Sequence, residues 1–239
     1  MRSCAVSPDG TWIVSASADN TLKMWDAASG TERTPIAGDT AVCYAISPDG
    51  AWIVCDSGDS GPRILDAATG AERVTFTGHT GWVNDCAVSP DGTLVVSASN
   101  DRTLRIWDVA TGTERAVLIL PGEASVVAFH PSAPMVVCGD KGGGVHLARL
   151  VGIQLGPLLV TAAIRGHELA VRCPACRETF PVQRDRLGAE TTCPRPVCGT
   201  RLRINTSLLQ PLPPLAPTPL PPPSRQSQHE RKHSWFRRR

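Results

Sequence analysis

The tetrapeptide Ser-Pro-Asp-Gly at Ser89–Gly92 decides the fold, because it recurs at regular intervals along the 239-residue chain. Identical copies stand at Ser7–Gly10 and Ser47–Gly50, and a degenerate copy, His-Pro-Ser-Ala, stands at His130–Ala133. Successive copies start 40, 42 and 41 residues apart. A period of about 40 residues with short strands indicates a repeat fold, in which each unit packs against its neighbours.

The third repeat shows the structure expected of one unit. Strands are predicted at Trp82–Val88, Thr93–Ser99, Thr103–Trp107 and Glu114–Leu120, where β-branched and apolar residues lie between turn residues. The Ser-Pro-Asp-Gly sequence fits a type I turn, with proline at its second position and glycine at its fourth. Four short antiparallel strands per period predict one blade of a β-propeller.

We therefore expect four blades in residues 1–164. Their predicted bounds are 2–36, 37–77, 78–120 and 121–164. Because the first repeat starts inside its first strand, we expect the C-terminal part of a larger propeller, or a half-ring that pairs with another chain. An open arc of blades would expose apolar faces at both ends, which favours association.

The third repeat resembles a WD-repeat unit of the WD40 type. The residues that carry the resemblance are Gly78–His79, the Ser-Pro-Asp-Gly turn, Ser97–Ser99, Asp101 and Leu104–Asp108. Near-identical segments such as Thr69–Arg73 and Thr111–Arg115 resemble bacterial repeats of this family. The resemblance implies a buried hydrogen-bond network within the blade, formed by His79, Ser99, Asp101 and Trp107.

These four residues also admit another interpretation, a Ser-His-Asp catalytic triad. The blade already explains their arrangement, and no oxyanion-hole motif accompanies them. The chain also lacks a convergent set of acid, base and nucleophile. We therefore expect no catalytic residues and no enzyme activity.

The other repeats depart from the complete pattern. The first keeps Asp19 and Trp25, whereas the second has Asp39 in place of histidine and Leu65 in place of tryptophan. In the fourth, Leu147 is aligned with the tryptophan. We expect the complete network in the third blade alone.

The cysteines form two groups. The first group is scattered over predicted strands and comprises Cys4, Cys43, Cys55, Cys86 and Cys138. Cys55 and Cys138 stand where other repeats have Ser15 and Ser97, so we expect small buried residues in a reducing cytoplasm rather than disulfides. The start of the chain shows no secretory signal, and the apolar stretch Leu150–Ile164 is too short to cross a bilayer.

The second group comprises Cys173, Cys176, Cys193 and Cys198, with 16 residues between the two pairs. Two cysteine pairs at this spacing are typical of a tetrahedral zinc site. Residues 165–206 accordingly resemble a zinc ribbon. Four protein ligands leave no open position, so we expect one structural Zn²⁺ ion. The alternatives are unliganded thiols or a redox pair.

Charge is distributed unevenly along the chain. Residues 1–164 hold 10 Lys and Arg against 17 Asp and Glu, whereas residues 165–204 hold 8 against 4. The basic ribbon could contact nucleic acid, or it could cap the last blade as terminal units do in repeat proteins. Residues 207–239 are rich in proline and then basic, which predicts a disordered tail.

As a whole, the sequence predicts an all-β protein. Four WD-type blades form a partial or open propeller, followed by a small zinc ribbon and a disordered tail. We expect a cytoplasmic, non-enzymatic interaction scaffold or sensor module that binds protein partners on the propeller surface, with no membrane contact. The alternative is a nucleic-acid-binding protein that uses the ribbon and the basic tail.

Overall fold

The structure is a computed structural model. It describes residues 3–17, 19, 21–33, 43–56, 61–153, 155–165 and 168–209. Within these residues the chain forms 19 β-strands and one short 3₁₀ turn, η1 (Arg184–Arg186). No helix in the described residues is long and apolar enough to cross a membrane.

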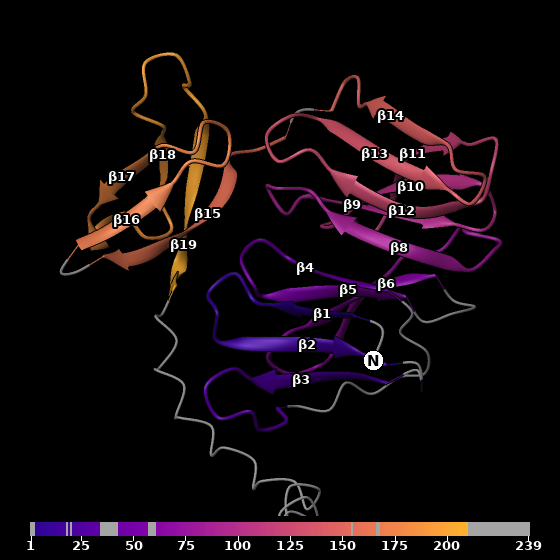
Figure 1. The fold of residues 1–239 in the computed structure, drawn as a ribbon, viewed down its shortest axis with the longest axis horizontal. Helices are drawn as coiled ribbons and strands as arrows, with labels where there is room; N and C mark the ends of the chain where they lie inside the picture. The colour runs from indigo at the N-terminus through magenta and orange to yellow at the C-terminus, as the bar shows by residue number, and fades with distance from the viewer. Residues whose placement is uncertain are drawn as a thin grey trace, which may run out of the picture.

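Four antiparallel sheets follow one another along the chain, and each is one blade (Figure 1). The strands of blade 1 are β1 (Ser3–Val6), β2 (Trp12–Ala16) and β3 (Leu22–Asp26). Those of blade 2 are β4 (Tyr44–Ile46), β5 (Trp52–Asp56), β6 (Pro62–Asp66) and β7 (Glu72–Thr75). Those of blade 3 are β8 (Val83–Val88), β9 (Leu94–Ser99), β10 (Thr103–Asp108) and β11 (Glu114–Ile119). Those of blade 4 are β12 (Ala124–Phe129), β13 (Met135–Asp140) and β14 (Val145–Arg149).

The blades are stacked in chain order, and a hydrophobic core fills each space between neighbours (Figure 1). Met24 of blade 1 meets Ile53 of blade 2 in the first core. Val54 of blade 2 meets Trp107 of blade 3 in the second. The third core joins blades 3 and 4. Burial between blades, rather than within one sheet, therefore stabilises the arc.

The Ser-Pro-Asp-Gly turns have one shared geometry. In each complete copy the serine hydroxyl donates to the aspartate Oδ1 at 2.6 Å. The same serine oxygen accepts a hydrogen bond from the backbone N–H five residues later, at 2.9–3.0 Å. The closing glycine has φ between 71° and 74° at Gly10, Gly50 and Gly92, a conformation that favours glycine. The recurring tetrapeptide is thus a self-contained turn between the first two strands of a blade.

A fifth sheet follows blade 4, and we call it the ribbon. Its strands are β15 (Leu158–Arg165), β16 (Glu168–Arg172), β17 (Thr179–Val182), β18 (Glu190–Thr192) and β19 (Arg201–Leu209). They lie in the order β17-β16-β15-β19-β18, and the central pair β15 and β19 is parallel. A separate core holds the sheet together, with Leu202 and Ile204 fully buried.

The boundary between blade 4 and the ribbon differs from the prediction. The sequence analysis placed residues 121–164 in the fourth blade, whereas β15 belongs to the ribbon sheet. The reason is burial: Leu158, Val160 and Ala162 pack into the ribbon core. Blade 4 consequently has three strands in the described residues, and the ribbon sheet starts at Leu158 instead of residue 165.

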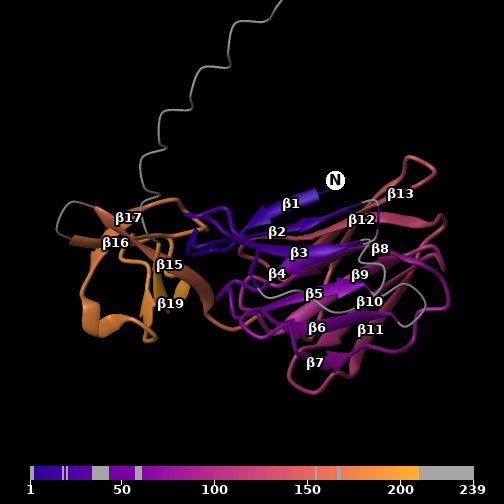
Figure 2. The same cartoon turned by 90° about the horizontal axis from the view of Figure 1, so that it is seen from below.

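The ribbon lies against the Ser-Pro-Asp-Gly turns of blades 2 and 3 rather than over the outer face of blade 4 (Figures 1 and 2). Asn205 Nδ2 donates to the carbonyl of Pro48 at 2.9 Å, and Leu159 N–H donates to the carbonyl of Pro90 at 3.0 Å. Gly156 N–H donates to the Asp91 carboxylate. The ribbon therefore covers one rim of the arc and does not cap the last blade.

The predicted disordered tail, residues 207–239, is largely outside the described residues. Its first three residues belong to β19, which continues to Leu209. Residues 210–239 lie outside the part of the chain that the structure describes.

Candidate functional site

Blade 3 holds a continuous chain of buried hydrogen bonds. Trp107 Nε1–H donates to Ser97 Oγ at 2.8 Å, and Ser97 Oγ lies 2.6 Å from His79 Nε2. His79 Nδ1 lies 2.8 Å from Asp101 Oδ2. A neutral histidine with its proton on Nδ1 satisfies every group, because Ser97 can then donate to Nε2 and His79 to Asp101.

Burial and hydrogen bonding set the protonation states of this network. Burial lowers the pKa of His79 below its ordinary value, which favours the neutral ring. Burial alone would raise the pKa of Asp101, but hydrogen bonds from Thr103 and His79 outweigh it and lower the pKa to about 2. Asp101 is therefore ionised and His79 neutral at physiological pH.

The serine of the network differs from the predicted one. The structure brings together His79, Asp101 and Trp107, as the resemblance implied, but it joins them through Ser97 and not Ser99. Ser99 Oγ instead donates to the carbonyl of Gly81 at 3.0 Å and accepts from Asp101 N–H at 3.1 Å. Both serines face the same side of β9, two residues apart, and Ser99 lies one pleat further from Trp107.

The network has no access for a substrate. The His79 side chain is 1% exposed, and Ser97 is fully buried. The Ser97 oxygen also receives the indole N–H of Trp107. Ser97, His79 and Asp101 are connected as in a catalytic triad, but the serine oxygen is buried and already accepts the Trp107 indole N–H, so the arrangement is a structural network.

In blades 1 and 3 a serine lies beside a tryptophan. In blades 2 and 4 cysteine takes the place of the serine, and leucine or alanine takes the place of the tryptophan. The strand registers define four equivalent pairs: Ser15–Trp25, Cys55–Leu65, Ser97–Trp107 and Cys138–Ala148. In blade 1 the indole N–H again donates to the serine oxygen at 2.8 Å. An indole N–H needs an acceptor when buried, whereas leucine or alanine does not, so cysteine suffices in blades 2 and 4.

This register corrects one alignment from the sequence analysis. Leu147 was placed at the tryptophan position of the fourth repeat, but β13 and β14 pair Val136 with Ala148, as β9 and β10 pair Val95 with Trp107. Ala148 therefore stands at the tryptophan position. The ten-residue spacing from Ser15 to Trp25 and from Ser97 to Trp107 is a signal that would have identified both the serine and the register.

The scattered cysteines are free thiols, and most are buried as expected. Cys43, Cys55, Cys86 and Cys138 are buried, whereas Cys4 is exposed, which the sequence analysis did not foresee. Burial raises the pKa of Cys55 to about 11, so this thiol stays protonated. These side chains act as small apolar residues of the blades.

The four cysteines of the ribbon converge on one point. All four Sγ atoms lie within 4.8 Å of one another. The Sγ atoms of Cys173 and Cys198 are 3.8 Å apart, and those of Cys176 and Cys193 are 3.5 Å apart. A tetrahedral ion with metal–sulfur bonds of about 2.3 Å needs sulfur–sulfur edges of about 3.8 Å. The spacing fits a four-thiolate metal site and is too long for disulfide bonds.

Two turns of similar design hold the thiols. Cys173 N–H donates to the carbonyl of Glu178, and Arg177 N–H donates back to the carbonyl of Cys173, both at 2.8 Å. In the second turn, Cys193 N–H donates to the carbonyl of Thr200 at 2.9 Å. Arg177 and Gly199, which follow the last cysteine of each pair, both have positive φ, 64° and 58°. Each turn thus presents its two sulfurs on the same side.

The second turn also stabilises a thiolate. The Thr200 side chain and backbone N–H hydrogen-bond to Cys198 and lower the pKa of its thiol to about 6. The Thr200 Oγ1 atom lies 3.0 Å from the Cys198 Sγ atom. Metal binding requires deprotonated cysteines, so this hydrogen bond prepares a ligand for the site.

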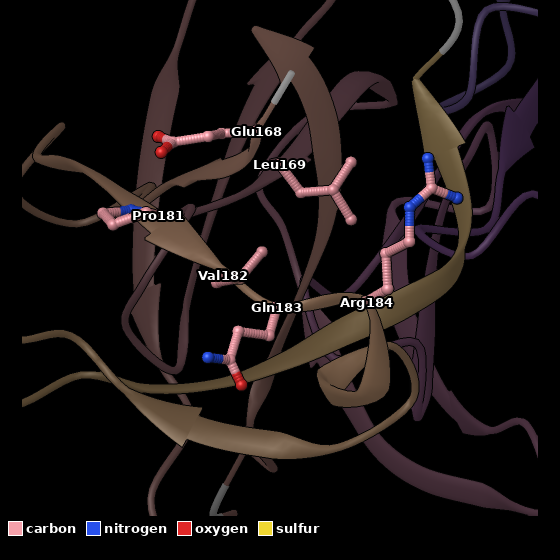
Figure 3. Close-up of a pocket in the computed structure, with 6 residues that line it drawn as sticks. All are labelled: Glu168, Leu169, Pro181, Val182, Gln183 and Arg184. Atoms are coloured by element: carbon pink, nitrogen blue, oxygen red, sulfur yellow. The ribbon is translucent and has the colours of Figure 1, made fainter.

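A surface pocket of about 560 Å³ lies along the edge strand β17 (Figure 3). It is lined by Glu168, Leu169, Pro181, Val182, Gln183 and Arg184. Glu168 and Arg184 are its ionisable residues, and neither belongs to a set of nucleophile, base and acid.

Comparison with known proteins agrees with the blade geometry. The family model described as "WD domain, G-beta repeat" matches residues 1–26 and 70–108, which include most of blade 3. A search of curated proteins found no match.

A solved structure of the WD40 β-propeller domain of Doa1 is similar in fold, with a TM-score of 0.54 and 25% sequence identity. The similarity covers 61% of this chain and 49% of that one, so the chain spans about half the length of the solved propeller. The blades of this chain therefore have the β-propeller fold, and residues 1–26 and 70–108 match the WD-repeat family model.

Proposed function

We propose that this chain is a cytoplasmic, non-enzymatic interaction scaffold that binds a protein partner on the rim of the propeller opposite the ribbon. Propellers of this type generally mediate contacts between proteins, and the polar residues that could suggest catalysis are used within the blades. The ribbon occupies the rim that carries the Ser-Pro-Asp-Gly turns. The opposite rim includes the start of β8 and the turn between β9 and β10. The ribbon does not cover this rim, so a partner can bind there.

The observation that carries this proposal is an exposed tryptophan on that rim. Trp82 is 52% exposed, and its backbone carbonyl accepts a hydrogen bond from Asn100 N–H at 2.9 Å. Lys141 Nζ reaches Asn100 Oδ1 at 2.9 Å and Glu123 Oε2 at 2.7 Å. An exposed tryptophan next to a residue of a fixed polar network has the composition of a protein-binding hot spot.

A comparison of captured proteins tests this assignment. Quantitative mass spectrometry would compare proteins retained by the wild-type chain, by Trp82→Ala and by the control Val151→Ala. Val151 is 89% exposed just after β14, at the rim that carries the turns and opposite Trp82. We expect a specific protein to be retained by the wild type and the control and lost with Trp82→Ala. Equal retention by all three chains would remove this rim from the proposal.

We further propose that the ribbon binds one structural Zn²⁺ ion through Cys173, Cys176, Cys193 and Cys198. The fit rests on the convergence of the four sulfur atoms and on their spacing. The ion would link the two turns and, with four protein ligands, keep no position for substrate. Elemental analysis of the purified chain should give one zinc per chain, and a value near zero would contradict the assignment.

The alternative, nucleic-acid binding by the ribbon, is less well supported. Arg201 and Arg203 both pair with Glu190, at 3.0 and 2.9 Å, so part of the ribbon's positive charge is neutralised within the protein. A salt-dependent mobility shift of DNA or RNA that disappears on deletion of residues 165–239 would favour this alternative.

A further inference from the structure

The two terminal blades of the arc each present an apolar face that no other part of the described chain covers. On blade 4 the face directed away from blade 3 carries Val126, Val137, Val145 and Leu147, which are 58%, 38%, 77% and 68% exposed. We call these four residues the end face. Isolated exposed apolar residues are ordinary, but four on one sheet face form a patch of the kind that marks an interface.

The end face has the composition of a blade–blade contact. By strand register, Val137, Val145 and Leu147 are equivalent to Val96, Leu104 and Ile106 of blade 3. Those three residues of blade 3 pack against blade 4. Their exposed fractions are 0%, 1% and 0%. The end face therefore repeats, with valine and leucine, the surface that blade 3 buries under its neighbour.

Blade 1 presents the complementary surface. Cys4, Val6, Ile13 and Trp25 form its face directed away from blade 2, and we call them the start face. By strand register they are equivalent to the following residues of blade 3: Cys86, Val88, Val95 and Trp107. The blade 3 residues lie in the core against blade 2. On blade 1, Cys4 is exposed, Val6 is 58% exposed, and Ile13 and Trp25 are half-buried.

The two ends of the arc therefore carry the two surfaces of a contact that neighbouring blades form three times within the arc. Blades 1 and 2, 2 and 3, and 3 and 4 each join a surface of the end-face kind to one of the start-face kind. The ribbon lies on the turns and leaves both faces uncovered (Figure 1). An end face and a start face can thus meet only between chains or through further blades.

The described arc corresponds to about half of a closed ring. The arc matches about half of a solved propeller of the same repeat type. Two arcs of four blades give eight, which is within the range of about four to eight blades seen in closed propellers. Repeated contacts between unlike surfaces form a closed ring when the rotations from one subunit to the next add up to a full turn. Two half-rings reach a full turn with two such contacts.

From these observations we propose that a second copy of this chain occupies the end face. Two chains close one eight-bladed ring head to tail, with each end face packed on the start face of the other copy. The ring has two equivalent interfaces, related by a twofold axis along the central channel. This assembly goes beyond the binding of a protein partner and does not depend on it.

The mass of the full chain in solution tests the proposal. Native mass spectrometry and light scattering over a series of protein concentrations should give a dimer, since association depends on concentration. Leu147→Asp and Val6→Asp should each raise the dissociation constant by roughly 100-fold or more, because a carboxylate would be buried without a partner. The control Val197→Asp, at an 89% exposed valine of the ribbon, should remain dimeric. Circular dichroism would show that all variants retain their strands.

Mixing the two variants distinguishes this geometry from other dimers. In a mixture of Leu147→Asp and Val6→Asp, one interface of the ring keeps two unmodified faces, so a heterodimer should form although neither variant dimerises alone. A monomeric wild type would overturn the proposal. So would a ladder of larger oligomers, a dimer insensitive to Val6→Asp, or saturation of the end face by blades of a different chain.

Discussion

Asn205, in the last strand of the ribbon, donates a hydrogen bond from its side-chain N–H to the backbone carbonyl of Pro48. Pro48 lies 157 residues earlier, in the Ser-Pro-Asp-Gly turn of blade 2. The same amide donates to Thr161 Oγ1 on the neighbouring strand at 2.8 Å. Asn205 is 4% exposed, so both bonds are made away from solvent. One side chain therefore joins the two central strands of the ribbon and attaches them to the propeller.

Replacing Asn205 should loosen the ribbon from the blades. Asn205→Ala leaves the Pro48 carbonyl and Thr161 hydroxyl without their donor, which costs about 1–3 kcal/mol for buried groups. We expect faster hydrogen exchange in residues 156–165 and at the turns of blades 2 and 3. Gln183→Ala, at an exposed residue of the ribbon, is the matched control and should exchange as the wild type does. Unchanged exchange in Asn205→Ala would show that the contact contributes little.

The serine of blade 3 should matter more than its equivalent in blade 1. Ser97→Ala leaves both the Trp107 indole N–H and His79 Nε2 without a partner, so we expect a loss of about 2–3 kcal/mol in blade stability. Ser15→Ala should cost about 1 kcal/mol, because it removes one hydrogen bond, that from the Trp25 indole, and leaves no histidine nitrogen without a partner. Native-state hydrogen exchange of β9 and β2 measures both losses. Equal losses would contradict a closed network in blade 3.

The stability of blade 3 should fall in acid in two steps. The pKa of His79 is lowered in the folded state, so its protonation favours unfolding and stability decreases as pH falls below about 6.5. Asp101 has a folded pKa of about 2 and an ordinary value of 3.8, so its contribution is present above about pH 4 and lost as pH falls towards 2.

Urea denaturation between pH 7 and pH 5 measures the first step. His79→Gln removes the titrating group and should flatten this part of the profile, although the variant is less stable throughout. Asp101→Asn should leave a slope between pH 7 and pH 5 and reduce the loss at lower pH, where other carboxylates of lowered pKa, such as Asp108, still contribute. A wild-type profile that is flat from pH 7 to pH 5 would disagree with a neutral, buried His79.

Loss of one metal ligand should unfold the ribbon and leave the blades intact. Binding of zinc by four thiolates contributes on the order of 10 kcal/mol, which is most of the folding free energy of a sheet this small. We expect Cys193→Ser to lower bound zinc to near zero and to abolish exchange protection in residues 168–209. The blade 3 amides should remain protected. Cys4→Ser, at an exposed cysteine of blade 1, should retain the full metal content.

The repeats could be predicted because their signals are local. A serine, a proline, an aspartate and a glycine make their own turn, as the shared 2.6 Å hydrogen bonds show, so the tetrapeptide identifies each blade wherever it occurs. The spacing of the cysteine pairs was equally informative. The structure brings all four thiols within 4.8 Å, which the sequence analysis expected from the lengths of the two turns and the loop between them.

The errors arose where tertiary packing decides between similar local choices. Ser97 and Ser99 share a strand face, and in the sequence only the ten-residue spacing between serine and tryptophan, common to blades 1 and 3, distinguishes them. The apolar residues of β15 would suit either a fourth strand of blade 4 or the ribbon. β15 belongs to the ribbon because it pairs with both β16 and β19. Since β19 lies about 40 residues further along the chain, this pairing is not visible in the local sequence.

The parallel pairing of β15 with β19 has a mechanical consequence. The blades pull on the first end of β15, and any attachment beyond Leu209 pulls on the last end of β19. Because the two strands run in the same direction, such a tension slides one along the other. The backbone bonds from Leu158–Leu202 to Ala163–Leu209 are then loaded together instead of opening one after another. A sheet paired in this way resists a pull along the chain with all of these bonds at once.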